Sequence, residues 1–453
     1  MRILQLLSIV IIACGTVHSV FAEDVGGKFI VHEWGTFTTF SGSDGAFVDF
    51  RPLVAEHKDL PNYVWDRGSF RKGPTLSKNR LWARVRMETP VTYFYTDRIR
   101  EVDVRVDFPQ GMLTEFYPPP QKILPKLDET IAFGKGEEIG DSSLDWGTIQ
   151  LIPQDKLLPE STDPKLRTLL ANEIVERLLP HGLNEQHYAA ARETDSALVH
   201  LRRDVVRGYG SGKPNPQKSF FEKFLFYRGV GKFDLPYSTE FSGDTVSIRN
   251  DGTQAMNSAI YIRVTGDQIQ ATRIDQVPAG TSITFREPKD VSPVELEKLV
   301  KDSLVAEGLY EKEAASMVKT WQQSWFTEEG TRVLYMVPGE ITEELLPLHV
   351  DPKPQESLRV LVGRMEVMSP DDERQMAQDV AQSAKARQAF LTKQRTMPKK
   401  SNAQYQIPAS IERWGRMTEP ALVRISKISK DELVRAEAKR LLYQKVQRVS
   451  PRS

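Results

Sequence analysis

Cysteine is almost absent from this chain of 453 residues, in which Cys14 is the only one. A mature chain that begins after Ala22 would therefore have no disulfide and no thiolate metal site. Its fold would have to be held together by hydrophobic cores. A chain of 453 residues is long enough for two or three domains that each have such a core.

An excess of charge of one sign is also missing, because 61 Lys and Arg residues face 61 Asp and Glu residues. This balance argues against nucleic acid as a partner. Beyond the first residues, no apolar run approaches the length of about 20 residues that a membrane-spanning helix needs, so we expect no transmembrane segment in the mature chain. No Gly-x-Ser-x-Gly nucleophile elbow occurs.

The beginning of the chain predicts export. Arg2 supplies a positive start, Ile3–Ala13 is almost wholly apolar, and Val20–Ala22 resembles a signal peptidase site before Glu23. Residues 1–22 are therefore predicted to be a signal peptide of a periplasmic or secreted protein. A buried first helix is less favoured, because the run is not amphipathic.

A second processing route stays open. Ile11–Cys14 resembles the lipobox of bacterial lipoproteins, in which Cys14 would become the lipidated first residue. The apolar core before Cys14 is short, so cleavage after Ala22 is preferred, with lipid anchoring through Cys14 as the alternative.

Three β-strands are predicted in the first third of the chain. Val102–Phe108 alternates apolar and charged residues with period two, as in a strand with one buried face. Val91–Tyr95 is β-branched and aromatic, and Met112–Tyr117 follows a Pro-Gln-Gly turn. We expect these strands to pair as an antiparallel meander.

Short strands with turn signals, among them a tight turn at Gly266, recur between Phe224 and Phe285, which predicts a small sandwich of immunoglobulin-like style. A capping box at Ser292–Glu295 then opens a helical region. The predicted fold is α+β and β-rich: an antiparallel N-terminal sheet, a second small β-sandwich-like module, and a helical C-terminal part with a few strands. The predicted divisions are 1–22 signal peptide, 23–160 N-terminal β domain, 161–218 helix and flexible connection, 219–290 β-sandwich-like module, 291–368 α+β segment and 369–453 helical region.

Several short motifs resemble those of a family of exported bacterial proteins. They are His32–Thr38 (HEWGTFT), Arg86–Pro90 (RMETP) with Tyr93–Tyr95 (YFY), Phe108–Pro118, Phe224–Gly229 and Trp321–Tyr335. The resemblance covers most of the mature chain. It implies export and a single evolved architecture, and it supplies no activity and no catalytic residue.

Polar residues on the predicted N-terminal sheet could act as acids and bases or bind a metal. The candidates are His32, Glu33, Arg86, Glu88 and Glu115, together with Glu193 and Arg228 further along the chain. A structural ion pair with one satisfied histidine is the simpler interpretation. Adjacent His32 and Glu33 point to opposite faces of a strand and cannot serve one site without a bulge.

Three histidines, His181, His187 and His200, lie near Glu193 and Asp195 and are the richest candidate metal cluster. No pair of them has the i, i+4 spacing of a zinc-protease helix, so surface histidines are the simpler interpretation.

Two further motifs resemble functional sites, but each has a simpler interpretation. Residues 208–213 evoke a phosphate loop, but Arg207 and Pro214 stand where that motif needs glycine and serine or threonine. Trp321 and Trp325 could line a sugar-binding cleft, yet their helical spacing favours a place in the core.

Two function classes remain from the sequence. The first is an exported binding or structural module of the cell envelope or the outside of the cell, with a partner in that compartment. The alternative is an exported hydrolase, metal-assisted or not, that uses the histidines and carboxylates above. The sequence identifies no cofactor, and the first class is preferred.

The signal segment yields the first testable prediction. The mature protein is expected to begin at or near Glu23, because the charge, the apolar core and the Val-x-Ala ending all place cleavage after Ala22. N-terminal sequencing of exported material checks this. A cytoplasmic product that keeps Met1 would contradict it, and a lipid-modified Cys14 would support the alternative route.

Overall fold

The computed structural model describes residues 27–53, 60–68, 76, 78–126, 139–160, 162–203, 218–395 and 405–449. The predicted signal peptide, Cys14 and the glycine-rich stretch 208–213 lie outside these described residues. The fold is α+β, with several antiparallel sheets and with helices in the C-terminal part, as predicted.

A ten-stranded sheet runs through the whole molecule in the order β16-β14-β13-β17-β19-β1-β3-β10-β5-β2. Its central strand β1 pairs in parallel with β19 and antiparallel with β3. The strands are β1 (Phe29–Ser41), β2 (Trp65–Asp66), β3 (Val85–Thr96), β5 (Gly111–Tyr117), β10 (Leu225–Gly231), β13 (Met256–Thr265), β14 (Gln268–Val277), β16 (Lys289–Asp290), β17 (Gly330–Val337) and β19 (Glu356–Val367).

Two smaller sheets pack against one face of this large sheet. Trp146 packs on Tyr227 with ring centroids 6.3 Å apart, and Tyr237 packs on Tyr335 at 5.1 Å. The six-stranded sheet contains β18 (Leu348–Asp351), β4 (Arg100–Phe108), β7 (Ser142–Ile152), β8 (Leu198–Arg203), β9 (Lys218–Glu222) and β6 (Lys122–Leu124). The three-stranded sheet contains β11 (Tyr237–Ser242), β12 (Thr245–Asn250) and β15 (Thr281–Thr284).

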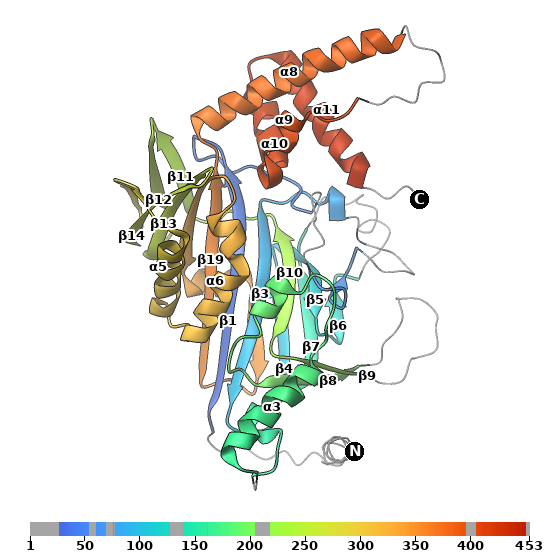
Figure 1. The fold of residues 1–453 in the computed structure, drawn as a ribbon, viewed down its shortest axis with the longest axis vertical. Helices are drawn as coiled ribbons and strands as arrows, with labels where there is room; N and C mark the ends of the chain where they lie inside the picture. The colour runs from blue at the N-terminus through green and yellow to red at the C-terminus, as the bar shows by residue number, and fades with distance from the viewer. Residues whose placement is uncertain are drawn as a thin grey trace.

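Helices cover the other face of the large sheet, and a helical cap closes one of its ends (Figure 1). On the face lie α4 (Gln186–Ala190), α5 (Pro293–Ala306) and α6 (Glu311–Phe326), with α3 (Pro164–Leu178) and α7 (Gly339–Leu345) elsewhere. The helical cap consists of α8 (Pro370–Arg395), α9 (Ala409–Glu412), the 3-10 helix η3 (Gly415–Met417), α10 (Thr418–Ile428) and α11 (Glu432–Val449). Two more 3-10 helices are η1 (Lys78–Arg80) and η2 (Gln154–Lys156). Within the described part of the chain, no helix is both long and apolar enough to cross a membrane.

The helical cap has a core of its own that reaches back to the N-terminal strands. Met376, Leu422 and Leu441 from three of its helices form one apolar cluster with Phe40 and Phe50. The Phe40 and Phe50 rings meet edge to face at 4.7 Å. Apolar burial of this kind drives association, so the helical cap is held to the end of β1 as well as to itself.

The predicted strands at 91–95, 102–108 and 112–117 are confirmed, but their pairing as a meander is wrong. β3 pairs with β1 and β10, β4 pairs with β7 and β18, and β5 pairs with β10 and β2. The reason is that β3 is buried on both faces, as a central strand of a covered sheet must be. Alternation within β4 fixes which of its faces is buried but does not select its neighbours.

Other local predictions agree with the structure. The capping box of Ser292 and Glu295 opens α5, and Gly308, with φ of 106°, follows its end. The turn at Gly266 joins β13 to β14 as an antiparallel hairpin.

Residues 219–290 supply strands to all three sheets, so the predicted β module shares its strands with the rest of the chain.

The alternation in β4 gives a second prediction. Val104 is 2% exposed, whereas the side chain of Arg105 is 50% exposed and pairs with Asp107. Val104→Asp should cost several kcal/mol, because it buries an unpaired carboxylate and loses about 1.5–3 kcal/mol of apolar burial. Arg105→Asp, the control, should cost within about 1 kcal/mol, as for a surface ion pair. Chemical denaturation measures both variants, and equal losses would show that the register is different.

Candidate functional site: a cleft between the sheet and the helical cap

A cleft of about 1180 Å³ lies between the α6 face of the large sheet and the helical cap. Charged side chains of both signs line it, and among the described residues they are seven arginines and eight carboxylates. They are Arg51, Arg86, Arg228, Arg263, Arg332, Arg413 and Arg416, with Glu88, Glu328, Glu329, Glu366, Asp371, Asp372, Glu412 and Glu419. This near balance suits a ligand that carries both signs of charge rather than a polyanion.

Irregular pairing crosses four neighbouring strands beside the cleft. The β1–β3 register shifts between Trp34 and Thr36, the β3–β10 register shifts between Phe226 and Gly229, and the β10–β5 register shifts between Arg228 and Gly229. Bulges bend strands and re-aim side chains, and they are common next to functional sites. The strand segments involved are those that carry the motifs His32–Thr38, Arg86–Pro90 and Phe224–Gly229.

In β3, Thr89 lies between Glu88 and Val91, where the pairing with β1 changes register. Its φ is 48°, which is rare for a β-branched residue. Across from it, a Cβ on Gly35 would lie 3.0 Å from the Pro90 Cα, so glycine permits the close approach of β1. Thr89 is 6% exposed and lines the cleft, and its hydroxyl has no hydrogen-bond partner among the described residues. Backbone strain of this kind collects at functional sites.

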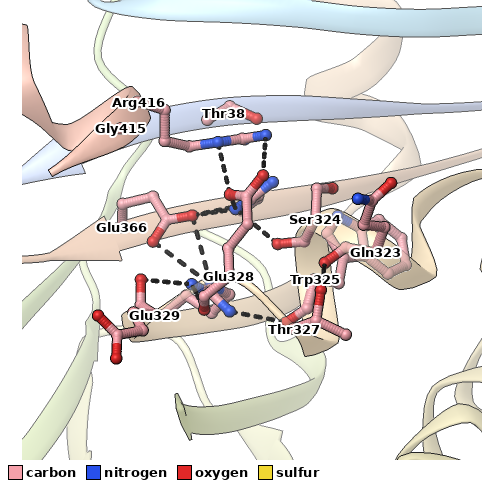
Figure 2. A network of polar contacts seen from close by, with 12 residues as sticks. Thr38, Gln323, Ser324, Trp325, Thr327, Glu328, Glu329, Glu366, Gly415 and Arg416 are labelled. Carbon is pink, nitrogen blue, oxygen red and sulfur yellow. Dashed lines mark hydrogen bonds and ion pairs between the residues drawn. The ribbon is translucent and has the colours of Figure 1, made fainter. Parts of the chain in front are cut away.

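An ionic network forms the floor of the cleft (Figure 2). Glu366 on β19 accepts hydrogen bonds from Arg364 Nε at 2.6 Å and from Arg332 Nε at 3.3 Å. Glu328, after α6, pairs with Arg364 Nη2 at 3.1 Å and with Arg416 Nε at 2.7 Å. Arg416 also donates through Nη2 at 3.0 Å, so it binds Glu328 with two nitrogens and ties η3 of the helical cap to the sheet.

Glu88 is held next to this network. Thr38 Oγ1 donates to its carboxylate at 2.7 Å, and Arg86 Nε lies 3.1 Å away. Burial raises the pKa of Glu88, but the charges of Arg86, Arg416 and Arg364 and the Thr38 hydrogen bond outweigh burial and lower this pKa to about 2. Glu88 is therefore an ionised, fixed carboxylate at neutral pH.

Glu366 behaves in the same way. Burial raises its pKa, and the charges of Arg332 and Arg364 outweigh burial and hold the pKa below its usual range. Glu88 and Glu366 are both buried at the cleft floor, and both are thus ionised at neutral pH. Their chemistry is to orient arginines and polar groups, since a general acid needs a raised pKa.

Of the residues predicted from the sequence, Arg86, Glu88, Arg228 and His187 line the cleft. Glu33 does not, because it lies on the opposite face of β1. There its carboxylate accepts hydrogen bonds from Thr92 (2.8 Å), Tyr227 (2.6 Å) and Arg359 (2.7 Å). All of these partners are buried, so Glu33 is the centre of a structural network between the sheets.

His32 lies near the beginning of α6, away from the cleft. Its Nδ1 is 2.9 Å from Glu313, which also accepts hydrogen bonds from the Tyr95 hydroxyl and the Tyr310 backbone N–H, each at 2.8 Å. Glu313 therefore fixes both His32 and the first turn of α6. Glu193 is exposed and pairs with Lys319.

Glu115 is buried on β5 and pairs with Lys78 and Thr114. Burial raises its pKa, and the charge of Lys78 outweighs burial and holds the pKa below its usual range. Glu115 stands opposite Arg228 in the β5–β10 pairing, and the charge of this arginine also lowers the Glu115 pKa.

The three candidate metal-ligating histidines take separate partners. His181 bonds the Glu176 carbonyl, His187 donates from Nδ1 to the Thr320 carbonyl, and His200 stacks on Phe221. In the described ranges, no group of three or more His, Cys, Asp or Glu residues is placed to hold a metal ion. The arrangement therefore gives the metal interpretation no support.

The tryptophans Trp321 and Trp325 stack on each other with ring centroids 6.2 Å apart and are 7% and 0% exposed. Neither presents an open ring face to a sugar, in agreement with the core interpretation. Trp321 nevertheless lines the cleft, and its buried indole N–H finds no hydrogen-bond partner in the part of the chain that the structure describes.

Sequence reasoning missed most of the cleft floor, namely Thr38, Glu328, Arg332, Arg364, Glu366 and Arg416. The sequence nevertheless contains one indication of these residues. Arg364 and Glu366 interrupt the apolar run of β19, and Arg332 interrupts that of β17, although these strands are buried along most of their length. Charged residues inside a buried strand need partners, which marks them as parts of a network.

No protein-family model and no curated protein matches this chain. Among solved structures, the yeast delta-COP-I mu-homology domain superposes with a TM-score of 0.26 at 7% identity, over 76% of this chain and 100% of that chain. The Fcho1 mu homology domain of Danio rerio with bound Eps15 peptide gives a TM-score of 0.25 at 8% identity, over 76% and 98%. The yeast delta-COP-I domain complexed with a Dsl1 WxWxV peptide gives 0.23 at 7% identity, over 76% and 97%. Likeness at this level establishes neither a common fold nor a common function.

Two threonines of the cleft give a matched prediction. Thr38→Val removes a hydrogen bond to a buried carboxylate and should cost about 1.5–3 kcal/mol of unfolding free energy. Thr89→Val removes a hydroxyl that has no partner and keeps the β-branched shape at the same φ, so its cost should stay within about 0.5 kcal/mol or turn into a gain. Denaturant titration of both variants decides. A loss for Thr89→Val equal to that for Thr38→Val would show that the Thr89 hydroxyl is bonded.

Proposed function

We propose that this protein is an exported peptide-binding module and that its ligand lies in the cleft between the large sheet and the helical cap. The carrying observation is the cleft itself, with its floor of fixed charged groups. Export is supported by the charge and apolar pattern of the first 22 residues.

The size of the cleft favours an extended ligand. Sites for single small molecules usually measure about 300–1,000 Å³, and this cleft, at about 1180 Å³, exceeds them. It receives side chains from β1, β3, β10, β17, α6 and the helical cap, so a ligand in it would contact elements from most of the chain. A peptide segment offers the length, the backbone polar groups and the side chains of both charges that such a lining can bind.

The floor is organised before a ligand arrives. Glu366, Arg332 and Arg364 are at most 1% exposed and hold one another in place. Side chains fixed in this way lose little conformational entropy on binding, and preorganisation of this kind raises affinity without additional contacts.

The same features favour binding over hydrolysis. A general acid or base works best with a pKa near the operating pH, and the buried Glu88 has a pKa of about 2. Its hydrogen bond from Thr38 and its ion pair with Arg86 occupy it structurally. The buried carboxylates of the cleft floor therefore stay ionised and do not exchange protons near neutral pH.

Gln323 and Gln322 on α6 provide a test with a matched control. Gln323 is exposed and lines the cleft (Figure 2), whereas Gln322 is exposed and is not among the cleft residues. Gln323→Trp should fill part of the cleft, and Gln322→Trp should add the same side chain outside it. Matched thermal midpoints confirm that both variants are folded.

The measurement uses displayed random peptides of roughly 12 residues, which span about 40 Å when extended. Peptides selected on the wild-type mature chain are synthesised, and their Kd values are measured on all three proteins. The expected result is binding at least about 10-fold weaker to Gln323→Trp and unchanged within about 2-fold for Gln322→Trp. Equal binding to all three proteins, or a selection that enriches no peptide, would overturn the proposal.

A further inference from the structure

A second groove, of about 440 Å³, lies where an edge of the large sheet meets an edge of the three-stranded sheet. It is lined by Thr272–Ile274 of β14, by Ser282–Thr284 of β15 and by Arg286. Among the described residues, none lines both this groove and the cleft under the helical cap. β14 lies at the side of the molecule away from β5 (Figure 1), so the groove is a separate surface of the protein.

The groove exists because the chain changes sheets between β14 and β15. A turn at 278–280 joins the two strands, with Gly280 at φ of 68° and with the Thr281 N–H bonded to the Pro278 carbonyl at 3.3 Å. β14 belongs to the large sheet and β15 to the three-stranded sheet, so the two strands do not pair with each other. Two strand edges therefore open onto one groove.

The edge of β15 directs backbone groups into the open. The Phe285 N–H donates to the Val246 carbonyl, on the β12 side, at 2.8 Å. Backbone hydrogen-bonding groups alternate between the two sides of a strand, so Ser282 and Thr284 direct their N–H and C=O groups away from β12. β15 is the end of its sheet, and no strand among the described residues pairs with that side.

β14 has an open edge on the same groove. The Val291 N–H donates to the Ile269 carbonyl at 2.9 Å, and the pairing of β16 with β14 reaches no further than Ala271. By the same alternation, Arg273 and Asp275 direct their backbone groups to this side. In the described part of the chain, no strand pairs with β14 there.

The other edges of the described sheets are protected, as natural proteins protect exposed edges with charged residues, proline, bulges or covering loops. At the opposite edge of the small sheet, the Phe241 N–H of β11 donates to the Ser43 carbonyl at 2.9 Å, so the loop after β1 lies along that edge. The end strands β2, β9, β16 and β18 each contain a charged residue. β15 reads Thr-Ser-Ile-Thr, without charge or proline, and pairs with β12 in one continuous register.

We propose that this groove binds an extended segment of a partner protein, which adds to the edge of β15 as a further β-strand. Main-chain hydrogen bonds give such strand addition its affinity. The four residues of β15 span about 13 Å at 3.2–3.4 Å per residue, which suits a short segment. A second copy of this chain fits less well, because stable interfaces bury about 1,200–2,000 Å² and two such short edges supply only a small part of that area.

Charge at the groove selects a segment with an acidic side chain. Among the described residues, the lining contains two arginines and no carboxylate. Arg273 lies 3.0 Å from Asp275, which partners its charge beside the groove. Arg286 is exposed and forms no ion pair with any residue that the structure describes. An aspartate or glutamate of the added strand would therefore pair with Arg286.

The test uses displayed random peptides of roughly 12 residues on the mature chain with Gln323→Trp, which fills part of the cleft. Peptides selected there are synthesised, and their Kd values are measured on wild type, Ser282→Pro and Ser282→Ala. Ser282→Pro removes the outward N–H of β15 and leaves the bonds to β12, whereas Ser282→Ala, the matched control, changes the side chain alone.

At least one group of selected peptides is expected to bind Ser282→Pro about 10-fold or more weakly than wild type, and Ser282→Ala within about 2-fold of wild type. Methylation of single backbone N–H groups of these peptides should weaken binding at every second position, as strand pairing requires. This pattern is read on wild type, so it decides the matter even if Ser282→Pro fails to fold.

The acidic side chain has a test of its own. Replacing that Asp or Glu of the peptide by Asn or Gln should weaken binding to wild type about 2-fold to 5-fold, as for an exposed ion pair. The same replacement should have no effect on binding to Arg286→Gln. An unchanged Kd on wild type, or an equal loss on both proteins, would overturn the pairing with Arg286.

The added strand is overturned if no selected peptide depends on Ser282→Pro or on alternate N–H groups, or if Ser282→Ala loses as much affinity as Ser282→Pro. This site goes beyond the proposed function and fails separately from it. Peptides that depend on Gln323 and not on the β15 edge overturn the added strand and leave the cleft standing. Peptides that depend on the β15 edge, without any that depends on Gln323, do the reverse.

Discussion

The two-nitrogen contact of Arg416 with Glu328 is the interaction on which the cleft depends. It joins η3 of the helical cap to the end of α6, and Glu328 passes the connection to Arg364 in the large sheet. Apolar packing of Phe40 and Phe50 with the cap helices supplies the attraction between the two parts. Buried and half-buried ion pairs add little net stability, but their geometry selects one arrangement over others. The cleft therefore has a defined width because charge pairs set its floor.

The register shifts between β1, β3, β10 and β5 determine which side chains of these strands line the cleft. Regular strands would alternate side chains strictly between the two faces. The register shifts let the consecutive residues Glu88 and Thr89 both line the cleft together with Arg228. In a regular strand, two consecutive side chains would face opposite sides of the sheet. Gly35 allows β1 to pass close to Pro90, so a glycine in one motif and a proline in another meet at one point of the sheet.

Much of the fold could be predicted, because the signals are local. The alternation of β4, the capping box of α5 and the turn at Gly266 each depend on residues within a few positions. Strand neighbours could not be predicted in this way. β1 pairs with β19, which lies near the other end of the chain, and no local pattern indicates that pairing.

The residues of the site likewise divide into those that a local sequence signal indicates and those that only the strand order brings together. Arg86, Glu88 and Arg228 stood out as charged residues beside aromatic motifs and do line the cleft. Glu328, Arg364, Glu366 and Arg416 come from the second half of the chain and join them only through the order β19-β1-β3. Glu33 was misleading for a physical reason. A carboxylate beside a histidine resembles a catalytic pair, yet the strand turns the two side chains to opposite faces and each finds separate buried partners.

Departures from local rules are therefore the better guide to what the cleft does. Among the described non-glycine residues with positive φ, Thr89 alone is β-branched. Among the described residues, its hydroxyl and the Trp321 indole N–H have no acceptor, although both side chains are buried. Each departure costs free energy in the empty protein, and sequences in general keep such costs where function requires them. The Thr89 conformation and these two unbonded donors all belong to residues that line one cleft, which is why a function of that cleft explains them more simply than three separate structural accidents.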